Sequence, residues 1–322
     1  MNKIKILILI FTLLWITLYM QSCRKDDSNK NIGLLPKLSK YQIFKGNPKN
    51  LIPSDEYKLY ELSTQLFTDY SEKQRLIRVP SGYPAIAIND DLPDFPEGTT
   101  MVKTFYYFND KTDLSKGKRI IETRILIKLN GKWNIGTYVW NDEQTDATLI
   151  TDAQNTTVNW KNENGTAKTI SYHIPSNQEC VSCHISTETV IPIGPKIRNL
   201  NFDVVRGGKI NQLTHFVNEG ILKPVNSSSF SSLPNSQDAS VSLKNRGRAY
   251  LDINCAHCHK KNGSASNINL YFGYEIPFNE TKIGDNKNAI INRTANGSMP
   301  AIGITIKHDE GITLIKEYIE SL

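Results

Sequence analysis

The sequence predicts an α+β multidomain protein with a β-rich, sandwich-like N-terminal domain, a middle segment and an all-α C-terminal domain. Three observations lead to this class. Residues 41–174 contain short runs rich in Ile, Val, Thr, Tyr and Trp, separated by turn residues. Residues 241–322 instead place apolar residues at helical spacing. Between them, residues 175–240 are punctuated by Gly-Pro and Gly-Gly pairs and include a Ser- and Asn-rich run.

Strands are predicted wherever β-branched and aromatic residues cluster between turn signals in the first domain. Asn130-Gly131 between two long runs is a strong hairpin signal, and Asn164-Gly165 is a second one. The pattern indicates an antiparallel sandwich or a curved sheet. The predicted strands cover residues 75–79, 100–108, 119–129, 132–140, 147–151, 156–160 and 168–173.

Helices are predicted over residues 209–219, 242–254 and 309–322. The last of these places Ile312, Leu314, Ile315, Tyr318 and Ile319 on one face, which predicts a helix with a buried side. The helix over 209–219 is expected to end at a glycine, the residue type most often found just after a helix.

Two copies of C-x-x-C-H account for four of the five cysteines: the first motif is residues 180–184 and the second is residues 255–259. Two thiols at this spacing can attack the two vinyl groups of one haem, and the following imidazole can then bind the iron. The thioether residues would be Cys180, Cys183, Cys255 and Cys258. The sequence therefore predicts two covalently bound haem c groups.

Other uses of these four thiols are possible. A zinc ribbon also uses paired C-x-x-C motifs, but the two pairs lie far apart here and zinc leaves both following histidines unexplained. A thioredoxin-like redox motif requires a neighbouring βαβ pattern, which the sequence lacks. Structural disulfides remain an alternative because the N-terminal pattern predicts export.

The order helix, C-x-x-C-H, loop, Met-Pro and terminal amphipathic helix resembles a class I cytochrome c domain, which implies an all-α cytochrome c-like fold for residues 241–322. The chain as a whole is similar to a family of exported bacterial dihaem c-type cytochromes. That similarity is carried by short stretches at residues 43–46, 95–99, 122–124, 140–146, 193–196 and 254–259. It implies haem binding and electron transfer and names no substrate.

The motifs assign His184 to the first iron and His259 to the second as proximal ligands. For the distal side of the second haem, the cytochrome c resemblance implies Met299, which is followed by proline in a Gly- and Ser-containing loop. His308 is the alternative. His257 lies inside the attachment motif on the proximal side and is not expected to be a distal ligand.

The distal ligand of the first haem is more open. His215 lies in the predicted helix after the first motif, and His173 lies at the end of a predicted strand just before it. Met101 falls inside a strand and is expected to be a core residue. A vacant or water-bound iron is the further alternative, and it would permit peroxide chemistry.

The N-terminus predicts export and a lipid anchor. Residues 1–22 combine two lysines with a short apolar run, as in a signal peptide. Cys23 follows a serine and resembles the lipidated cysteine of bacterial lipoproteins, and residues 23–40 are predicted to be a polar tether. The resemblance implies a cell-envelope location, lipid-anchored to the outer membrane and facing the periplasm or the surface. The net charge of +6 includes no long Lys/Arg run, so nucleic-acid binding has no support.

These patterns predict an electron carrier rather than an enzyme, with redox proteins as donor and acceptor. A dihaem peroxidase is the enzymatic alternative, although in that family the first haem motif lies close to the mature N-terminus. An electron-transfer subunit of a periplasmic dehydrogenase is a third possibility. No Ser-His-Asp pattern, phosphate-binding loop or H-E-x-x-H motif supports a hydrolase.

Overall fold

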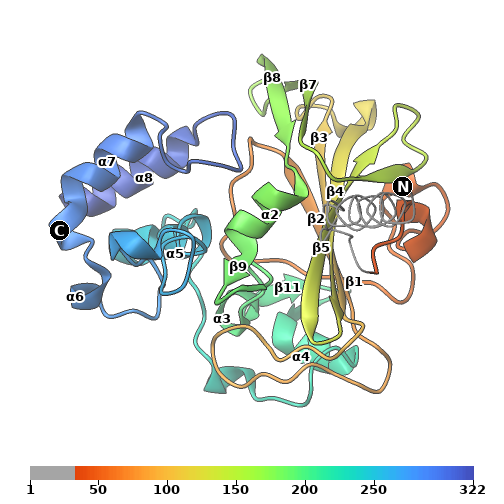
Figure 1. The fold of residues 1–322 in the computed structure, drawn as a ribbon, viewed down its shortest axis with the longest axis horizontal. Coiled ribbons are helices and arrows are strands. Elements are labelled where there is room, and N and C mark those ends of the chain that lie inside the picture. Colours follow the sequence, from red (N-terminus) through yellow and green to blue (C-terminus); the bar gives the residue numbers. More distant parts are fainter. Residues whose placement is uncertain (1–32) are drawn as a thin grey trace, which may run out of the picture. The chain divides into compact units, whose positions relative to one another are not determined.

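The structure is a computed structural model that describes residues 33–322. Its main element is one antiparallel sheet of six strands, in which each strand pairs with the next along the chain (Figure 1). The strands are β1 (Lys58–Leu59), β2 (Glu72–Arg78), β3 (Thr100–Phe108), β4 (Lys118–Leu129), β5 (Lys132–Trp140) and β6 (Ala147–Ile150). The predicted Asn130-Gly131 hairpin is confirmed, because Leu129 pairs with Lys132 across it.

Each face of the sheet is covered by a different part of the chain. Side chains alternate between the two faces, so the neighbours Leu76 and Ile77 enter different cores. The core on the Leu76 face is completed by the N-terminal segment, including Leu38, Ile43, Leu51 and Tyr57. The core on the Ile77 face is completed by residues that follow the first motif, including Ile197, Leu200, Leu213 and Phe216.

A separate hairpin is formed by β7 (Gln154–Lys161) and β8 (Ala167–Ile174). The Asn164-Gly165 turn lies between its strands, as the sequence predicts. Val158, Trp160, Ile170 and Tyr172 of this hairpin pack against Tyr107 of β3. Every strand predicted in this part of the chain is therefore present, with boundaries shifted by a few residues at most.

Short elements follow the hairpin: α2 (Asn177–His184), β9 (Ile185–Ser186), β10 (Thr189–Val190), α3 (Ile197–Leu200), β11 (Asp203–Val205), β12 (Lys209–Asn211) and α4 (Gln212–Asn218). The predicted helix over residues 209–219 is thus only partly correct. Residues 209–211 pair with β11 as a strand. The helix begins after Asn211, whose side chain accepts hydrogen bonds from the amides of Leu213 and Thr214.

The C-terminal part contains α5 (Leu243–Asn254), α6 (Phe278–Thr281), α7 (Lys287–Ala295) and α8 (Asp309–Glu320). The helices α5 and α8 pack closely at Gly247, where an added Cβ would lie only 2.5 Å from Cγ of Tyr318. A glycine at this position lets the Tyr318 ring lie directly against the α5 backbone. The helix predictions for residues 242–254 and 309–322 are confirmed within two residues.

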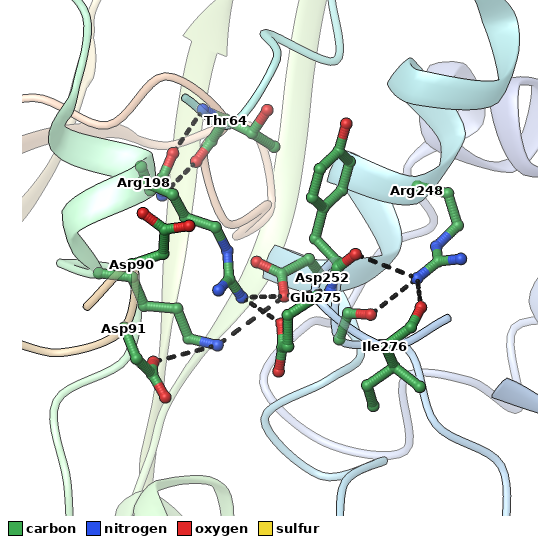
Figure 2. Close-up of polar contacts among 12 residues, drawn as sticks. Thr64, Asp90, Asp91, Arg198, Arg248, Asp252, Glu275 and Ile276 are labelled. Carbon is green, nitrogen blue, oxygen red and sulfur yellow. Dashed lines mark hydrogen bonds and ion pairs between the residues drawn. The ribbon is translucent and has the colours of Figure 1, made fainter. Parts of the chain in front are cut away.

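The predicted α+β multidomain class, with a sandwich-like N-terminal domain and an all-α cytochrome c-like C-terminal domain, is wrong. The described chain is mainly a single antiparallel sheet with short helices, and residues 33–322 form one compact unit. The helices after residue 241 do not form a self-contained domain because buried polar contacts join them to earlier segments. Arg198 of α3 donates to Asp252 of α5 at 2.9 Å and to Glu275 at 2.6 Å (Figure 2).

A second set of hydrogen bonds joins the C-terminal residues 305–310 to the earlier residues Asp69 and Tyr70. The carboxylate of Asp69 accepts hydrogen bonds from the backbone amides of Thr305 and Ile306. Tyr70 donates to Glu310 at 2.7 Å. Apolar spacing revealed the helices but carried no sign of these distant partners, which is why the sequence suggested a separate domain.

The predicted signal peptide, the lipidated Cys23 and most of the tether lie outside the described residues. Within residues 33–322, none of the helices combines the length and the apolar character needed to cross a bilayer.

Candidate functional site

The first motif lies on α2 and its helical geometry is set by a capping box. The Ser176 hydroxyl accepts from the amide of Glu179, and the Glu179 carboxylate accepts from the amide of Ser176. Although partial burial opposes the effect, hydrogen bonds from Ser176 and His173 lower the pKa of Glu179. The capping box thereby fixes the first turn of the helix, which ends at His184.

The side chains of the first motif have different neighbours, and that of Cys180 faces the sheet. Cys180 is buried, and its sulfur lies 3.6 Å from the hydroxyl of Thr137 on β5. The Nδ1 of His184 lies 2.7 Å from the carbonyl oxygen of Ile191. Since a carbonyl can only accept, Nδ1 carries the proton and Nε2 keeps its lone pair. Burial lowers the pKa of His184 to about 3, so the ring is a neutral imidazole at neutral pH.

The second motif follows α5 directly. This helix starts at the Ser242 cap, and the amide of Cys255 still donates to the carbonyl of Leu251, which continues the helical pattern into the motif. The amide of His259 donates to the carbonyl of Cys255 at 3.0 Å. Burial raises the pKa of Cys255 to about 12, which keeps its thiol protonated.

The structure brings the two motifs together. The sulfur atoms of Cys183 and Cys258 and a ring nitrogen of His257 all lie within 4.8 Å of one another. The hydrogen bond from Cys183 lowers the pKa of Cys258, and it raises the pKa of Cys183 correspondingly. This hydrogen bond joins two sulfurs that belong to different motifs.

A contact between the following loops supports the same arrangement. The turn between β9 and β10 meets the loop after the second motif, where the side-chain amide of Asn262 donates to the hydroxyl of Thr187 at 3.3 Å. The backbone amide of Thr187 donates to the carbonyl of Asn262 at 3.4 Å. Both motifs therefore lie in one site rather than in two.

The residues present meet the chemical requirements of c-type haem attachment. All four motif cysteines are free thiols. His184 offers an unprotonated Nε2, which is what an axial ligand requires. The Nδ1 of His259 is buried without a hydrogen-bond partner among the described residues, and its ring lies 5.2 Å from that of Phe272.

The same donors fit the metal alternative less well. A structural zinc site needs four ligands in a closed tetrahedron. Only Cys183, Cys258 and His257 converge among the described residues, while Cys180 instead faces Thr137. The predicted alternative of structural disulfides has no counterpart in the described residues, because these thiols are free.

The predicted distal ligands of the second haem lie near the C-terminal helices. Met299 is half-buried in the loop between α7 and α8, where its amide donates to the carbonyl of Arg293. His308 precedes α8, stacks on Phe67 at 4.1 Å between ring centroids, and its Nδ1 lies 2.8 Å from the hydroxyl of Tyr250. The His308 ring is thus already held by Phe67 and Tyr250, which makes Met299 the better candidate for the distal ligand.

The candidates for the first haem lie in different surroundings. His215 lies on α4, where the charged groups around it are Glu219, Arg206 and Lys58. Both ring nitrogens of His173 are hydrogen-bonded, one to Asn155 and the other to Glu179. No contact joins His215 to the first motif among the described residues, so its ligand role stays a prediction.

Met101 is buried in the core, as expected.

Two features of the site could not be found from sequence spacing. The first is that His257 meets Cys183, although the two residues are remote in sequence. The carbonyl of Ile191, which orients His184, carries no side-chain signal at all. Its place inside the second motif was the only feature of the sequence that pointed to His257.

Comparisons with protein-family models, with curated proteins and with solved structures find no match.

Proposed function

We propose that this protein is a dihaem c-type cytochrome that carries electrons in the cell envelope, anchored to the outer membrane through a lipid on Cys23. The observation that supports it best is the meeting of two C-x-x-C-H motifs, with free thiols, in one site. Electron transfer between two haems needs them close to each other, and Cys183 and Cys258 would hold the two groups at adjacent edges. Redox proteins would serve as donor and acceptor.

In this proposal the haem supplies one-electron redox chemistry, and the chain supplies attachment, orientation and burial. Cys180 and Cys183 hold the first group, while Cys255 and Cys258 hold the second. The Ile191 carbonyl keeps the proton on Nδ1 of His184, so that Nε2 stays available as a ligand. Burial of both motif histidines lowers their pKa values and favours the neutral imidazole.

The direct test is the mass and colour of the full chain produced in a host that can ligate haem. We expect a red protein whose mass exceeds that of the polypeptide by two haems. Cys183→Ala should disturb attachment of one haem, whereas Ser182→Ala, a change inside the same motif, should leave both attached. Colourless protein of bare polypeptide mass, or protein that holds zinc instead, would overturn the proposal.

A second measurement on the same holoprotein distinguishes an electron carrier from a peroxidase. An open iron that turns over peroxide would make the protein an enzyme. For a carrier we expect a fully six-coordinate spectrum and no peroxide turnover above that of free haem.

A further inference from the structure

Three cationic side chains form a row across the sheet. Arg75 of β2 pairs directly with Lys103 of β3, and Lys103 pairs directly with Arg124 of β4. Residues that face each other across strands share one face of a sheet and have neighbouring side chains. Like charges placed directly opposite each other repel, so this arrangement is unfavourable unless something neutralises it.

The row lies on the face of the sheet that also carries Ile77, and this face is covered by the residues that follow the first motif. The residue two positions beyond Arg75 is Ile77, and the corresponding neighbours of Lys103 and Arg124 are Met101 and Leu126. All three belong to the core that also contains Cys180. Arg75 is only 4% exposed, and the side chain of Arg124 is 19% exposed. Cations with so little access to water need anionic partners.

The described residues supply only part of that negative charge. Glu122 pairs with Arg124 through two hydrogen bonds of 2.9 and 2.6 Å. Lys103 has no carboxylate within ion-pair distance among the residues described, and its ammonium lies over the Phe105 ring. The nearest side-chain partner of the Arg75 guanidinium is the neutral Gln65, at 3.5 Å.

The pKa of Lys103 reflects this shortage of negative charge. Burial lowers the pKa of Lys103 well below its usual range, and the charges of Arg75, Lys73 and Arg124 lower it further. An anion bound beside Lys103 would restore its charged form.

The row leads to the first motif. Arg124 pairs across strands with Thr137 of β5, and the hydroxyl of Thr137 lies 3.6 Å from the sulfur of Cys180. The vinyl groups that form the thioethers and the propionates lie on opposite edges of a haem. A ring attached at Cys180 and lying along the row would therefore carry its propionates away from Thr137, toward Lys103 and Arg75. A haem carries two propionate carboxylates, and arginine is suited to bind carboxylates with two parallel hydrogen bonds.

We propose that Arg75 and Lys103 bind the propionate carboxylates of the haem attached at Cys180 and Cys183, while Arg124 stays paired with Glu122. This inference rests on the proposed function. Two propionates together with Glu122 would balance the three cations of the row. The row would fix the orientation of the first haem and keep its propionates ionised.

The test uses holoprotein whose mass already shows two haems, so that its failure is distinct from a failure of the proposed function. Lys103→Met is compared with Lys132→Met, a change of an exposed lysine at the end of β5 in the same sheet. Reduction potentials are measured across neutral pH, and resonance Raman spectra record the propionate bending bands.

We expect one of the two potentials to fall in Lys103→Met, since a nearby cation favours the reduced haem. That potential should also become pH-dependent, because an unpaired propionate has a higher pKa and titrates. The propionate bands should shift, while Lys132→Met should match the wild type. If Lys103→Met does not mature, Arg75→Gln is measured for the same changes.

Two outcomes would overturn the inference. The first is that Lys103→Met, or Arg75→Gln in its place, shows unchanged potentials and unchanged propionate bands. The second is that acetate added to the wild-type holoprotein shifts these bands or one potential. That response would mean that the row is open to free carboxylates rather than filled by propionates.

Discussion

The sulfur of Cys183 lies within 4.8 Å of the sulfur of Cys258, although Cys183 lies on α2 and Cys258 follows α5. Haems attached to two thiols in this position would have to lie close together. The relationship makes the distance between the two proposed haems a property of the fold, and it leads to the first prediction.

We expect the two haems of the oxidised holoprotein to be magnetically coupled, because their attachment points at Cys183 and Cys258 adjoin. Electron paramagnetic resonance spectra of fully oxidised and half-reduced samples measure this. The oxidised spectrum should be broader than the sum of two isolated haem signals. A spectrum that equals the sum of the separate signals would contradict the proximity of the motifs.

Met299→His should lower the reduction potential of the second haem, because an imidazole in place of a thioether stabilises the oxidised iron. Near-infrared magnetic circular dichroism distinguishes the two ligand pairs, and a potentiometric titration gives the shift. Met101→Leu is the control, since Met101 is 4% exposed in the core and should leave both spectra unchanged. An unaltered ligand band in Met299→His would exclude Met299 as a ligand.

Arg198→Met should lower the free energy of unfolding by about 3 kcal/mol, because the buried carboxylate of Asp252 loses its closer cationic partner and keeps only Lys196, at 3.8 Å. Denaturant unfolding of the holoprotein measures the change. The matched control is Arg78→Met, which removes an exposed ion pair with Glu56 and should cost about 1 kcal/mol or less.

The double variant Arg198→Met/Asp252→Leu should recover much of that loss, since it removes the stranded charge as well. A single Arg198→Met variant that is as stable as Arg78→Met would show that this buried pair does not join α3 to α5 as the structure suggests.

Glu179→Gln should remove part of the acid sensitivity of the first motif. The pKa of Glu179 is lowered in the folded chain, so its contribution to stability is present above the ordinary glutamate range and is lost as pH falls through the folded pKa. Glutamine can still accept the hydrogen bond of the capping box but does not titrate.

Thermal unfolding from neutral to acid pH tests this prediction. The wild type should lose stability on acidification more steeply than Glu179→Gln, and the exposed Glu280→Gln should follow the wild type. Parallel curves for the wild type and Glu179→Gln would show that the capping carboxylate does not contribute to acid sensitivity.

Local patterns predicted much of the secondary structure. Alternation of apolar residues and the Asn130-Gly131 turn located β4 and β5, and helical spacing located α5 and α8. The predicted fold class failed because periodicity reports which face of a helix is buried, not what buries it. The ion pair between Arg198 and Asp252 joins segments that the sequence suggested were separate domains.

By itself the sequence determined the chemistry that each motif can perform, because C-x-x-C-H spacing is a matter of covalent distance along one short stretch of chain. Only the tertiary structure decided that Cys183 and His257 would meet Cys258. It alone also placed Arg75, Lys103 and Arg124 in one row, whose last member pairs with Thr137, the neighbour of Cys180. The physical reason is that these distances depend on strand register and on how α2 packs against β5, and both are set by contacts between residues far apart in the sequence.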